Sequence, residues 1–218
     1  MNKNLAQFRE KINQLDDEII KILEERQKIV NQVSKLKAEN ISASFLMPKR
    51  EKEMLARLKS SSSSIPQELI QYIWRGIISF SLFSEKDFKI NKSHITSEDE
   101  LTKYFAAIIP IINHVNIEET LHNFEKHNED IIILSYQETI KHHKLLLNKQ
   151  LVCFKKFEKD EALAFAKITQ NYLDDEKFLL LGKLEKSDKT AKLIYQDKNF
   201  DLFESEKNDQ NNKFLGSY

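Results

Sequence analysis

The feature that most constrains the fold is an apolar seam over residues 3–38. Apolar side chains recur there at alternating spacings of three and four residues, which is the period of a coiled-coil heptad. No Gly or Pro interrupts the segment, so it predicts one helix ~50 Å long. A helix of that length exceeds the width of a small domain, so the seam predicts packing against a second chain and against shorter helices of its own chain. The seam positions are Leu5, Phe8, Ile12, Leu15, Ile19, Ile22, Arg26, Ile29, Val33 and Leu36.

Two shorter helices are predicted to follow the long one. Residues 39–48 break the heptad pattern and end at Pro48, and proline suits the first turn of a helix. A second helix is expected over 48–60, and a run of five serines over 60–64 then predicts a flexible joint. Ile65-Pro66 opens a third helix with regularly spaced apolar residues. Residues 1–90 are therefore predicted to form a three-helix domain.

The pattern changes after residues 91–97, a polar segment that predicts a linker. Strands that alternate with helices are typical of a small α/β domain, and we expect one over 98–203. The polar segment 204–218 predicts a disordered tail. The expected fold class is therefore α+β and multidomain. Strands or buried segments are expected at 104–115, 130–137, 149–157, 177–184 and 192–196, and helices at 116–128 and 160–173.

Composition argues against several classes of function. The chain has only three glycines and lacks the glycine-rich strings that cradle nucleotide phosphates. Its 34 basic and 34 acidic residues give zero formal net charge, which argues against a nucleic-acid partner. The single cysteine, Cys153, excludes an intrachain disulfide and a cysteine-rich zinc site, and the six histidines show no metal-ligand spacing. We expect no cofactor and no metal.

The location expected from the sequence is the cytoplasm. No apolar run approaches the ~20 residues that a membrane-spanning helix needs, so no membrane partner is expected. The first residues, MNKNLAQFREKINQLDDE, are polar and include acids, unlike a signal peptide or a typical transit peptide.

Arginine is confined to the first 75 residues, whereas lysine supplies the other 29 basic side chains. The guanidinium group is flat and always charged, so it suits a two-point grip on a carboxylate. Arg26 lies on the apolar seam, where an unpaired charge costs several kcal/mol. One interpretation is a register-setting residue paired with a glutamate. The other is an anion bound inside a helix bundle. The five arginines are Arg9, Arg26, Arg50, Arg57 and Arg75.

Helical geometry relates the cations of the long helix. Lys37 follows Arg26 by eleven residues, which places both on about the same face, ~16 Å apart along the axis. Arg9 lies ~100° around the same helix, so we expect it to serve a different site, such as that of a partner chain. Ser81 and Glu85 share a face of the third helix because they are four residues apart. Taken alone, that pair is an ordinary polar surface, and so is Arg50-Glu51.

Taken together, the motifs of the three predicted helices are more specific than any one of them alone. The strings LAQFREKINQLDDEIIKILEERQKIVNQVSKLK, PKREKEMLARL and ISFSLFSEKDF resemble the all-helical chorismate mutases over about residues 3–90. The shared motifs are an arginine before an LD pair, an ERR-like group in mid-helix and a lysine eleven residues later. An RE pair opens the second helix, and a serine lies four residues before Gln or Glu on the third. The resemblance implies an intertwined homodimer that converts chorismate to prephenate without a cofactor.

The same resemblance implies which side chains hold the reacting part of chorismate. Arg9 of the partner chain and Arg26 of the same chain would hold its two carboxylates. Lys37 and Glu85 would flank the ether oxygen of the breaking bond. The reaction is a unimolecular rearrangement, so it needs a clamped reactive conformer and positive charge near that oxygen. Glu85 contributes a hydrogen bond there only in its protonated form.

The remaining implied contacts lie around the ring hydroxyl of the substrate. Glu51 would accept a hydrogen bond from this hydroxyl, and Arg50 would support Glu51 or the substrate. Ser81 would form a hydrogen bond with a carboxylate. Met47 departs from the polar or acidic residue that many family members have near the hydroxyl, so recognition of the hydroxyl depends more heavily on Glu51.

The sequence also suggests a role for the second domain, residues 98–203, and leaves two alternative functions open. The run NIEETLHNFEKHNEDIIILSYQE resembles the helix–strand unit of periplasmic-binding-protein-like domains such as prephenate dehydratase. Residues 98–203 are too few for a full two-lobed dehydratase with a regulatory domain, and they contain no arginine, so a non-catalytic accessory or effector-binding role is expected. The alternatives to a mutase are an isochorismate pyruvate lyase of the same fold and a non-enzymatic dimerisation module.

Overall fold

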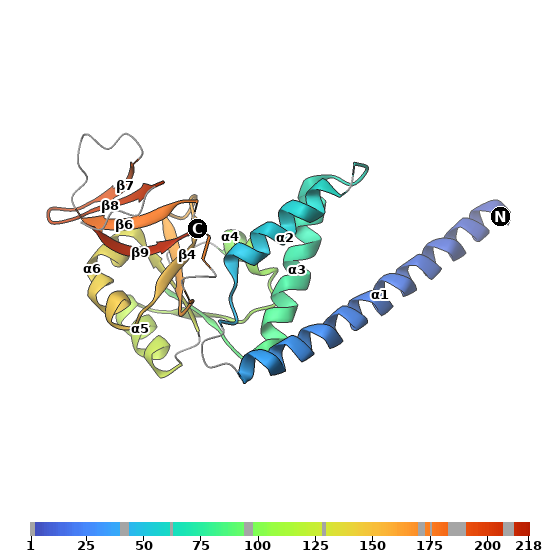
Figure 1. Ribbon diagram of the computed structural model, residues 1–218, viewed down its shortest axis with the longest axis horizontal. Coiled ribbons are helices and arrows are strands. Elements are labelled where there is room, and N and C mark those ends of the chain that lie inside the picture. Colours follow the sequence, from blue (N-terminus) through green and yellow to red (C-terminus); the bar gives the residue numbers. More distant parts are fainter. Residues whose placement is uncertain are drawn as a thin grey trace. The chain divides into compact units, whose positions relative to one another are not determined.

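A computed structural model of the chain describes residues 3–39, 44–61, 63–93, 98–127, 130–169, 173–174, 176–182, 191–206 and 212–218. By their contacts the residues fall into two compact units, Met1–Ala43 and Ser44–Tyr218. The first contains the helix α1, and the second contains the other described helices and a large mixed sheet (Figure 1). This combination is consistent with the predicted multidomain α+β class.

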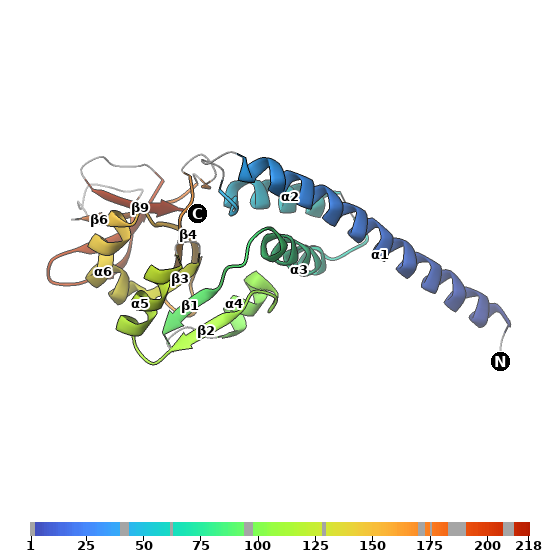
Figure 2. The ribbon, with the colours of Figure 1, turned by 90° about the horizontal axis from the view of Figure 1, so that it is seen from below.

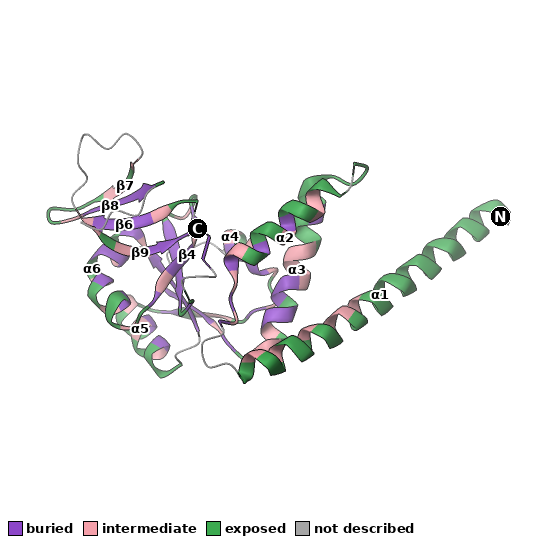
Figure 3. Cartoon of the chain, in the orientation of Figure 1, coloured by how far each residue is buried: buried purple, intermediate pink, exposed green. Residues whose placement is uncertain are grey.

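The helix α1 (Lys3–Ala38) confirms the long helix predicted from the heptad pattern. Lys35 and Lys37 lie in its last turn, where positive charge complements the helix dipole. The apolar seam is exposed, with Phe8 at 61% and Leu36 at 66% relative exposure, and Figure 3 shows most of α1 as exposed. A helix draws most of its stability from packing of its apolar face, and the prediction from the sequence that this seam packs against other helices stays a prediction.

The next two helices also begin and end near the predicted residues. The helix α2 (Pro48–Ser60) begins with a proline in its first turn, which suits a missing N–H donor. The helix α3 (Gln67–Glu85) follows Pro66, its N-cap residue. Leu55 of α2 and Ile78 of α3 are buried. These two helices therefore each bury one apolar face.

The core that buries α2 and α3 continues past residue 90. Leu55 and Ile78 belong to the same buried cluster as Phe88, Phe105 and Ile131. This shared core explains why the contacts divide the chain between residues 43 and 44. The division at residue 90 into a helical domain and an α/β domain remains a prediction from the sequence.

Within the described residues the sheet has nine strands, in the order β2-β1-β3-β5-β4-β9-β6-β8-β7. β1 is parallel to β2 and β3, and β4 is parallel to β9. The other described neighbours are antiparallel. The strands are β1 (Ile90–Ser93), β2 (Ile111–His114), β3 (Ile131–Ser135), β4 (Val152–Phe157), β5 (Ala162–Ala166), β6 (Phe178–Gly182), β7 (Lys192–Gln196), β8 (Asp201–Ser205) and β9 (Lys213–Ser217).

Helices cover both faces of the parallel part of the sheet (Figure 2). α4 (Glu98–Phe105) connects β1 to β2, and α5 (Ile117–Lys126) connects β2 to β3 on the other side of β1, since parallel strands need a crossover connection. α6 (Tyr136–Asn148) follows β3 and starts with a capping box between Ser135 and Glu138. The two core clusters contain alternate residues of β3, which is the two-residue period of a strand.

Four predicted strands and one helix are found close to their expected positions. β3, β4, β6 and β7 lie inside the segments 130–137, 149–157, 177–184 and 192–196. α5 lies inside the segment 116–128, and Asn116 caps it by accepting a hydrogen bond from the backbone N–H of Glu119. α6 was not predicted from the sequence.

The predicted linker 91–97 is wrong in its first part. Residues 91–93 belong to β1, between β2 and β3 in the sheet. Asn91 and Lys92 are almost fully buried, although they are polar. The Asn91 amide donates to Asp130 Oδ2 at 2.7 Å and its Oδ1 contacts His114 Nε2 at 2.9 Å. Hydrogen bonds of this kind compensate the burial of a polar side chain. Residues 94–97 lie outside the described residues.

Two further segments differ from the prediction. The segment 160–173, expected as a helix, contains β5, whose five residues are all buried. A strand covered on both faces appears as a continuous apolar run without alternation, which is why its sequence ALAFA resembled a helix. The segment 104–115 starts inside α4 and contains only the short strand β2 near its end.

The predicted tail 204–218 is also different in the structure. Residues 213–217 form β9, which lies between β4 and β6 in the sheet, and residues 204–205 end β8. Leu215 and Gly216 of β9 are buried. A few buried residues hold this strand in place although its surroundings in the sequence are polar. Residues 207–211 lie outside the described residues.

The contact between β9 and β4 leads to a stability prediction. Gly216 has φ +148°, and a Cβ at this position would lie 2.3 Å from the backbone N and O of Cys153. We expect Gly216→Ala to lower the free energy of unfolding by on the order of 3 kcal/mol, because both the backbone and the close approach require glycine. Gly76→Ala is the matched control, since its Cβ would meet only Ala106 Cβ at 3.9 Å. Urea unfolding measures both, and equal stabilities would contradict this packing.

Candidate active site

The seven predicted site residues lie on three helices in two units. Arg9, Arg26 and Lys37 lie on α1. The other four lie in the second unit, with Arg50 and Glu51 in the first turn of α2 and Ser81 and Glu85 in the last turns of α3.

The cations of α1 occupy two sets of positions on the helix. Arg26 and Lys37 are partly buried, whereas Arg9 is exposed. Since α1 is one uninterrupted helix, the eleven-residue spacing puts Arg26 and Lys37 on about the same face, ~16 Å apart along the axis. Arg9 lies ~100° around the helix from them. One helix of this kind can contribute cations to two different anion sites.

Glu51 is buried and forms an ion pair with an arginine that was not predicted as a site residue. Its Oε2 accepts a hydrogen bond from Arg75 Nη1 at 2.9 Å, and the two side chains are only 10% and 12% exposed. Glu51 comes from α2 and Arg75 from α3, so the pair connects the two helices. The one signal in the sequence was that Arg75 is among the five arginines of an otherwise lysine-rich chain.

Aromatic and cationic side chains of later elements surround this pair. The Arg75 guanidinium lies over the Tyr104 ring of α4, with Cζ 4.1 Å from the ring centroid. Burial acts to lower the pKa of Arg75, but Tyr104 and Glu51 outweigh it and raise that pKa above its ordinary value. Burial raises the pKa of the Tyr104 hydroxyl well above its usual range. Lys155 of β4 has a lowered pKa, first because of burial and then because of the Arg75 charge.

Ser81 and Glu85 lie one turn apart near the end of α3. Ser81 is buried, and its hydroxyl donates to the backbone carbonyl of Ile77 at 2.8 Å. A hydroxyl oxygen that donates its proton keeps acceptor capacity. Glu85 is the last residue of α3 and is partly exposed. The four-residue spacing therefore places both groups on one face, as the sequence predicted.

The start of α2 carries Met47 and Arg50. Met47 is the N-cap residue, and its side chain makes no capping hydrogen bond. Arg50 is exposed, in contrast to the buried Glu51 beside it. The two residues of the predicted RE pair thus have different environments, since Glu51 is buried and Arg50 is exposed.

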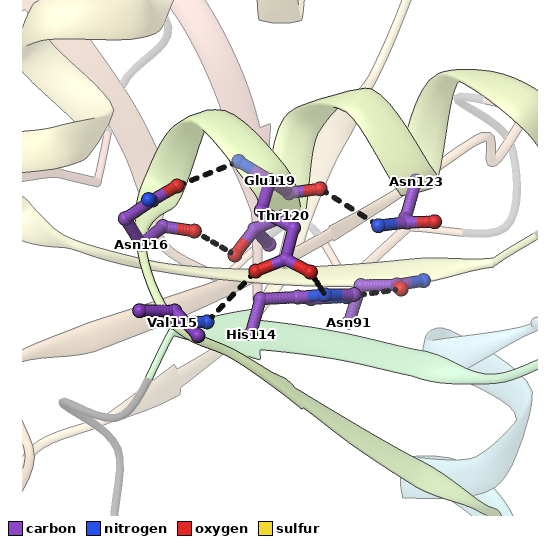
Figure 4. Close-up of polar contacts among 7 residues, drawn as sticks. All are labelled: Asn91, His114, Val115, Asn116, Glu119, Thr120 and Asn123. Carbon is purple, nitrogen blue, oxygen red and sulfur yellow. Dashed lines mark hydrogen bonds and ion pairs between the residues drawn. The ribbon is translucent and has the colours of Figure 1, made fainter.

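A second polar cluster lies at the end of β2, beside β1 (Figure 4). His114 Nε2 is 2.9 Å from Asn91 Oδ1, and His114 Nδ1 is 3.9 Å from Glu119 Oε1. Glu119 Oε2 accepts from the backbone N–H of Val115 at 3.0 Å. These bonds join two strands to the first turn of α5. We assign the cluster a structural role, because its polar groups satisfy one another.

Among the residues that the structure describes, no group of three or more His, Cys, Asp or Glu side chains is placed to hold a metal ion. None of the described helices is long and apolar enough to cross a membrane.

Comparisons with known proteins connect this geometry to a family. The family model described as Chorismate mutase type II matches residues 8–86. The chain is also 29% identical over 93 residues to the bifunctional chorismate mutase/prephenate dehydratase of Aquifex aeolicus (strain VF5). That match covers 40% of this chain and 25% of the relative. The N-terminal part of the chain is therefore similar to type II chorismate mutases.

The comparisons add nothing on the region after α3. No solved structure matches the chain. The resemblance of 98–203 to periplasmic-binding-protein-like domains is not confirmed.

Proposed function

We propose that this chain is a chorismate mutase that rearranges chorismate to prephenate. One observation carries the proposal: the family match over residues 8–86 includes every residue of the site inferred from the sequence. The site residues are Arg9, Arg26, Lys37, Arg50, Glu51, Ser81 and Glu85.

The proposed clamp uses the two faces of α1. Arg26 holds one carboxylate of chorismate, and Arg9 of a partner chain holds the other. Holding both carboxylates favours the compact conformer in which the bond-forming carbons lie close together. The entropy that the substrate loses in reaching this conformer is therefore largely lost on binding and not in the chemical step. The exposed seam of α1 and the position of Arg9 on another face of the helix support the homodimer that this clamp requires.

The proposed electrostatic part uses Lys37 and Glu85. Negative charge develops on the ether oxygen as its bond to the ring breaks, and the Lys37 ammonium stabilises that charge in a site shielded from water. Protonated Glu85 donates a second hydrogen bond to the same oxygen. All bonds broken and formed belong to one molecule, so the rearrangement needs no nucleophile or co-reactant.

The hydroxyl side of the proposed site uses Glu51, with Arg50 and Ser81 as further substrate contacts. The burial of Glu51 supports this assignment, because a buried carboxylate strengthens any hydrogen bond that it accepts from the ring hydroxyl. The region 98–203 is proposed to be an accessory or effector-binding domain, and the cytoplasm remains the expected location.

A direct test is to incubate the purified chain with chorismate and follow the loss of its absorbance. Conversion to prephenate supports the proposal. Conversion of isochorismate to salicylate and pyruvate would favour the lyase. No turnover of either substrate would favour the non-enzymatic dimerisation module.

Replacing Glu85 with glutamine separates a proton donor from a structural side chain. If Glu85 donates to the ether oxygen, wild-type kcat/KM falls with rising pH as Glu85 ionises, whereas glutamine keeps its donor at every pH. We expect Glu85→Gln to retain activity and to flatten the alkaline side of the profile. The measurement is kcat/KM from about pH 4 to 9 for both proteins. Superimposable pH profiles would show that Glu85 does not donate a hydrogen bond to the ether oxygen.

A further inference from the structure

The buried Glu51–Arg75 pair is the starting point of an inference that rests on the proposed function. Both side chains are about nine-tenths buried, and their contact at 2.9 Å is a charge-assisted hydrogen bond. A buried carboxylate without its cation would take up a proton or rearrange, since an unpaired buried charge is costly. Arg75 therefore both orients Glu51 and favours its ionised form.

Arg75 is itself held by a residue from beyond the helical segment. Tyr104 of α4 stacks on the guanidinium at 4.1 Å, and Tyr104 also lies edge-on to Phe157 of β4, with ring centroids 6.1 Å apart. Lys155 of β4 lies 5.4 Å from the centroid of the same Tyr104 ring. The arginine is thus fixed between Glu51 on one side and the face of a ring anchored on the sheet.

We propose that Arg75 is a positioning residue for Glu51, and that Tyr104 fixes Arg75, so that the region after residue 90 supports recognition of the substrate hydroxyl. An ionised carboxylate only accepts hydrogen bonds, and its two oxygens can accept several at once. With Oε2 held by Arg75, the carboxylate keeps one orientation toward the hydroxyl. In addition to the shared apolar core, this stack connects α3 to the region of the sheet.

Charged side chains near the Glu51–Arg75 pair influence how easily Glu51 takes up a proton. Arg75 of α3 contacts Glu51 directly, Lys155 of β4 adds positive charge, and Glu100 of α4 adds negative charge near Lys155. Removing the Arg75 charge removes a cation in direct contact with Glu51, so Glu51 takes up a proton more easily. A protonated Glu51 no longer serves as the intended acceptor, which lowers activity on the acid side of the profile.

The experiment compares Arg75→Met with wild type in the full chain. We expect a loss of at least tenfold in kcat/KM and a shift of the acid limb toward higher pH. Arg75→Lys keeps the charge without the planar fork, so its acid limb stays near that of wild type while KM rises. Arg57→Met is the control, because Arg57 is an exposed arginine of α2 outside the site.

Tyr104 variants test the second half of the proposal. Tyr104→Phe keeps the stacking ring, so its pH profile should match wild type. Tyr104→Leu removes the ring, so we expect a several-fold loss in kcat/KM and a smaller shift of the acid limb in the same direction. If Arg75→Met does not fold, as circular dichroism would show, Arg75→Lys and Tyr104→Leu decide the question.

A double-variant cycle separates positioning from a general loss of folding. The effect of Arg75→Met on kcat/KM should shrink several-fold in a Glu51→Gln background, because the arginine acts through Glu51. An equal loss in both backgrounds, or an unmoved acid limb in Arg75→Met, would overturn the proposal. A wild-type KM for Arg75→Lys together with a wild-type acid limb for Tyr104→Leu would also overturn it. A folded wild-type chain without mutase activity would instead overturn the proposed function, and with it the positioning role of Arg75.

Discussion

Arg26→Ala is expected to lower kcat/KM by about 100-fold or more, equivalent to roughly 3 kcal/mol of transition-state binding. The guanidinium is proposed to grip a substrate carboxylate by two charge-assisted hydrogen bonds, and alanine removes both. Lys28→Ala is the control, because Lys28 is an exposed cation two residues away on the same helix. A loss below threefold for Arg26→Ala would show that the seam arginine does not hold the substrate.

Complementation between two inactive chains tests the origin of Arg9. In a mixed dimer of Arg9→Ala and Arg26→Ala chains, one site receives both intact arginines and the other receives neither. With statistical mixing, half of the dimers are mixed, so we expect about a quarter of wild-type activity to return. Failure to recover activity in isolated mixed dimers would show that both arginines act within one chain.

A charge placed on the seam of α1 is expected to abolish assembly. Ile19 is 55% exposed in the single chain and lies in the middle of the heptad pattern. Ile19→Glu would bury a carboxylate in the proposed interface, which costs several kcal/mol. We expect the dimer to dissociate at micromolar concentration and activity to fall at least 100-fold, because each site loses the partner's Arg9.

Gln14→Glu is the matched control for this experiment. It adds the same charge to the same helix at a position outside the seam. Light scattering and activity at matched concentrations measure both variants. A wild-type chain that is monomeric and fully active at micromolar concentration would contradict the intertwined assembly.

The elements set by local pattern were predictable from the sequence. The unbroken heptad seam predicted α1, and the prolines at residues 48 and 66 predicted where α2 and α3 begin. In contrast, β5 and β9 depend on pairing with other strands of the sheet, which their own short sequences do not reveal. ALAFA is a strand because β3 and β4 flank it, and KFLGS is held between β4 and β6.

In the candidate site, too, relations within one helix were predictable from the sequence, whereas contacts between elements were not. Spacing along a single helix was enough to relate Arg26 to Lys37 and Ser81 to Glu85. The role of Arg75 was not predictable, because its partners come from α2 and α4, 24 and 29 residues away in the sequence. Only packing between elements shows that a buried arginine orients a neighbouring carboxylate. Sequence spacing therefore identified candidate contacts to the substrate but not the residue that supports Glu51.

The most direct measurement of the central claim is product identification from chorismate. Purified chain is incubated with chorismate, and the product is identified by NMR, alongside the Arg26→Ala variant to exclude a contaminating mutase. The account predicts prephenate as the product, formed by wild type and at least 100-fold more slowly by the variant. Unchanged chorismate with the folded wild-type chain, or equal rates for both proteins, would contradict it.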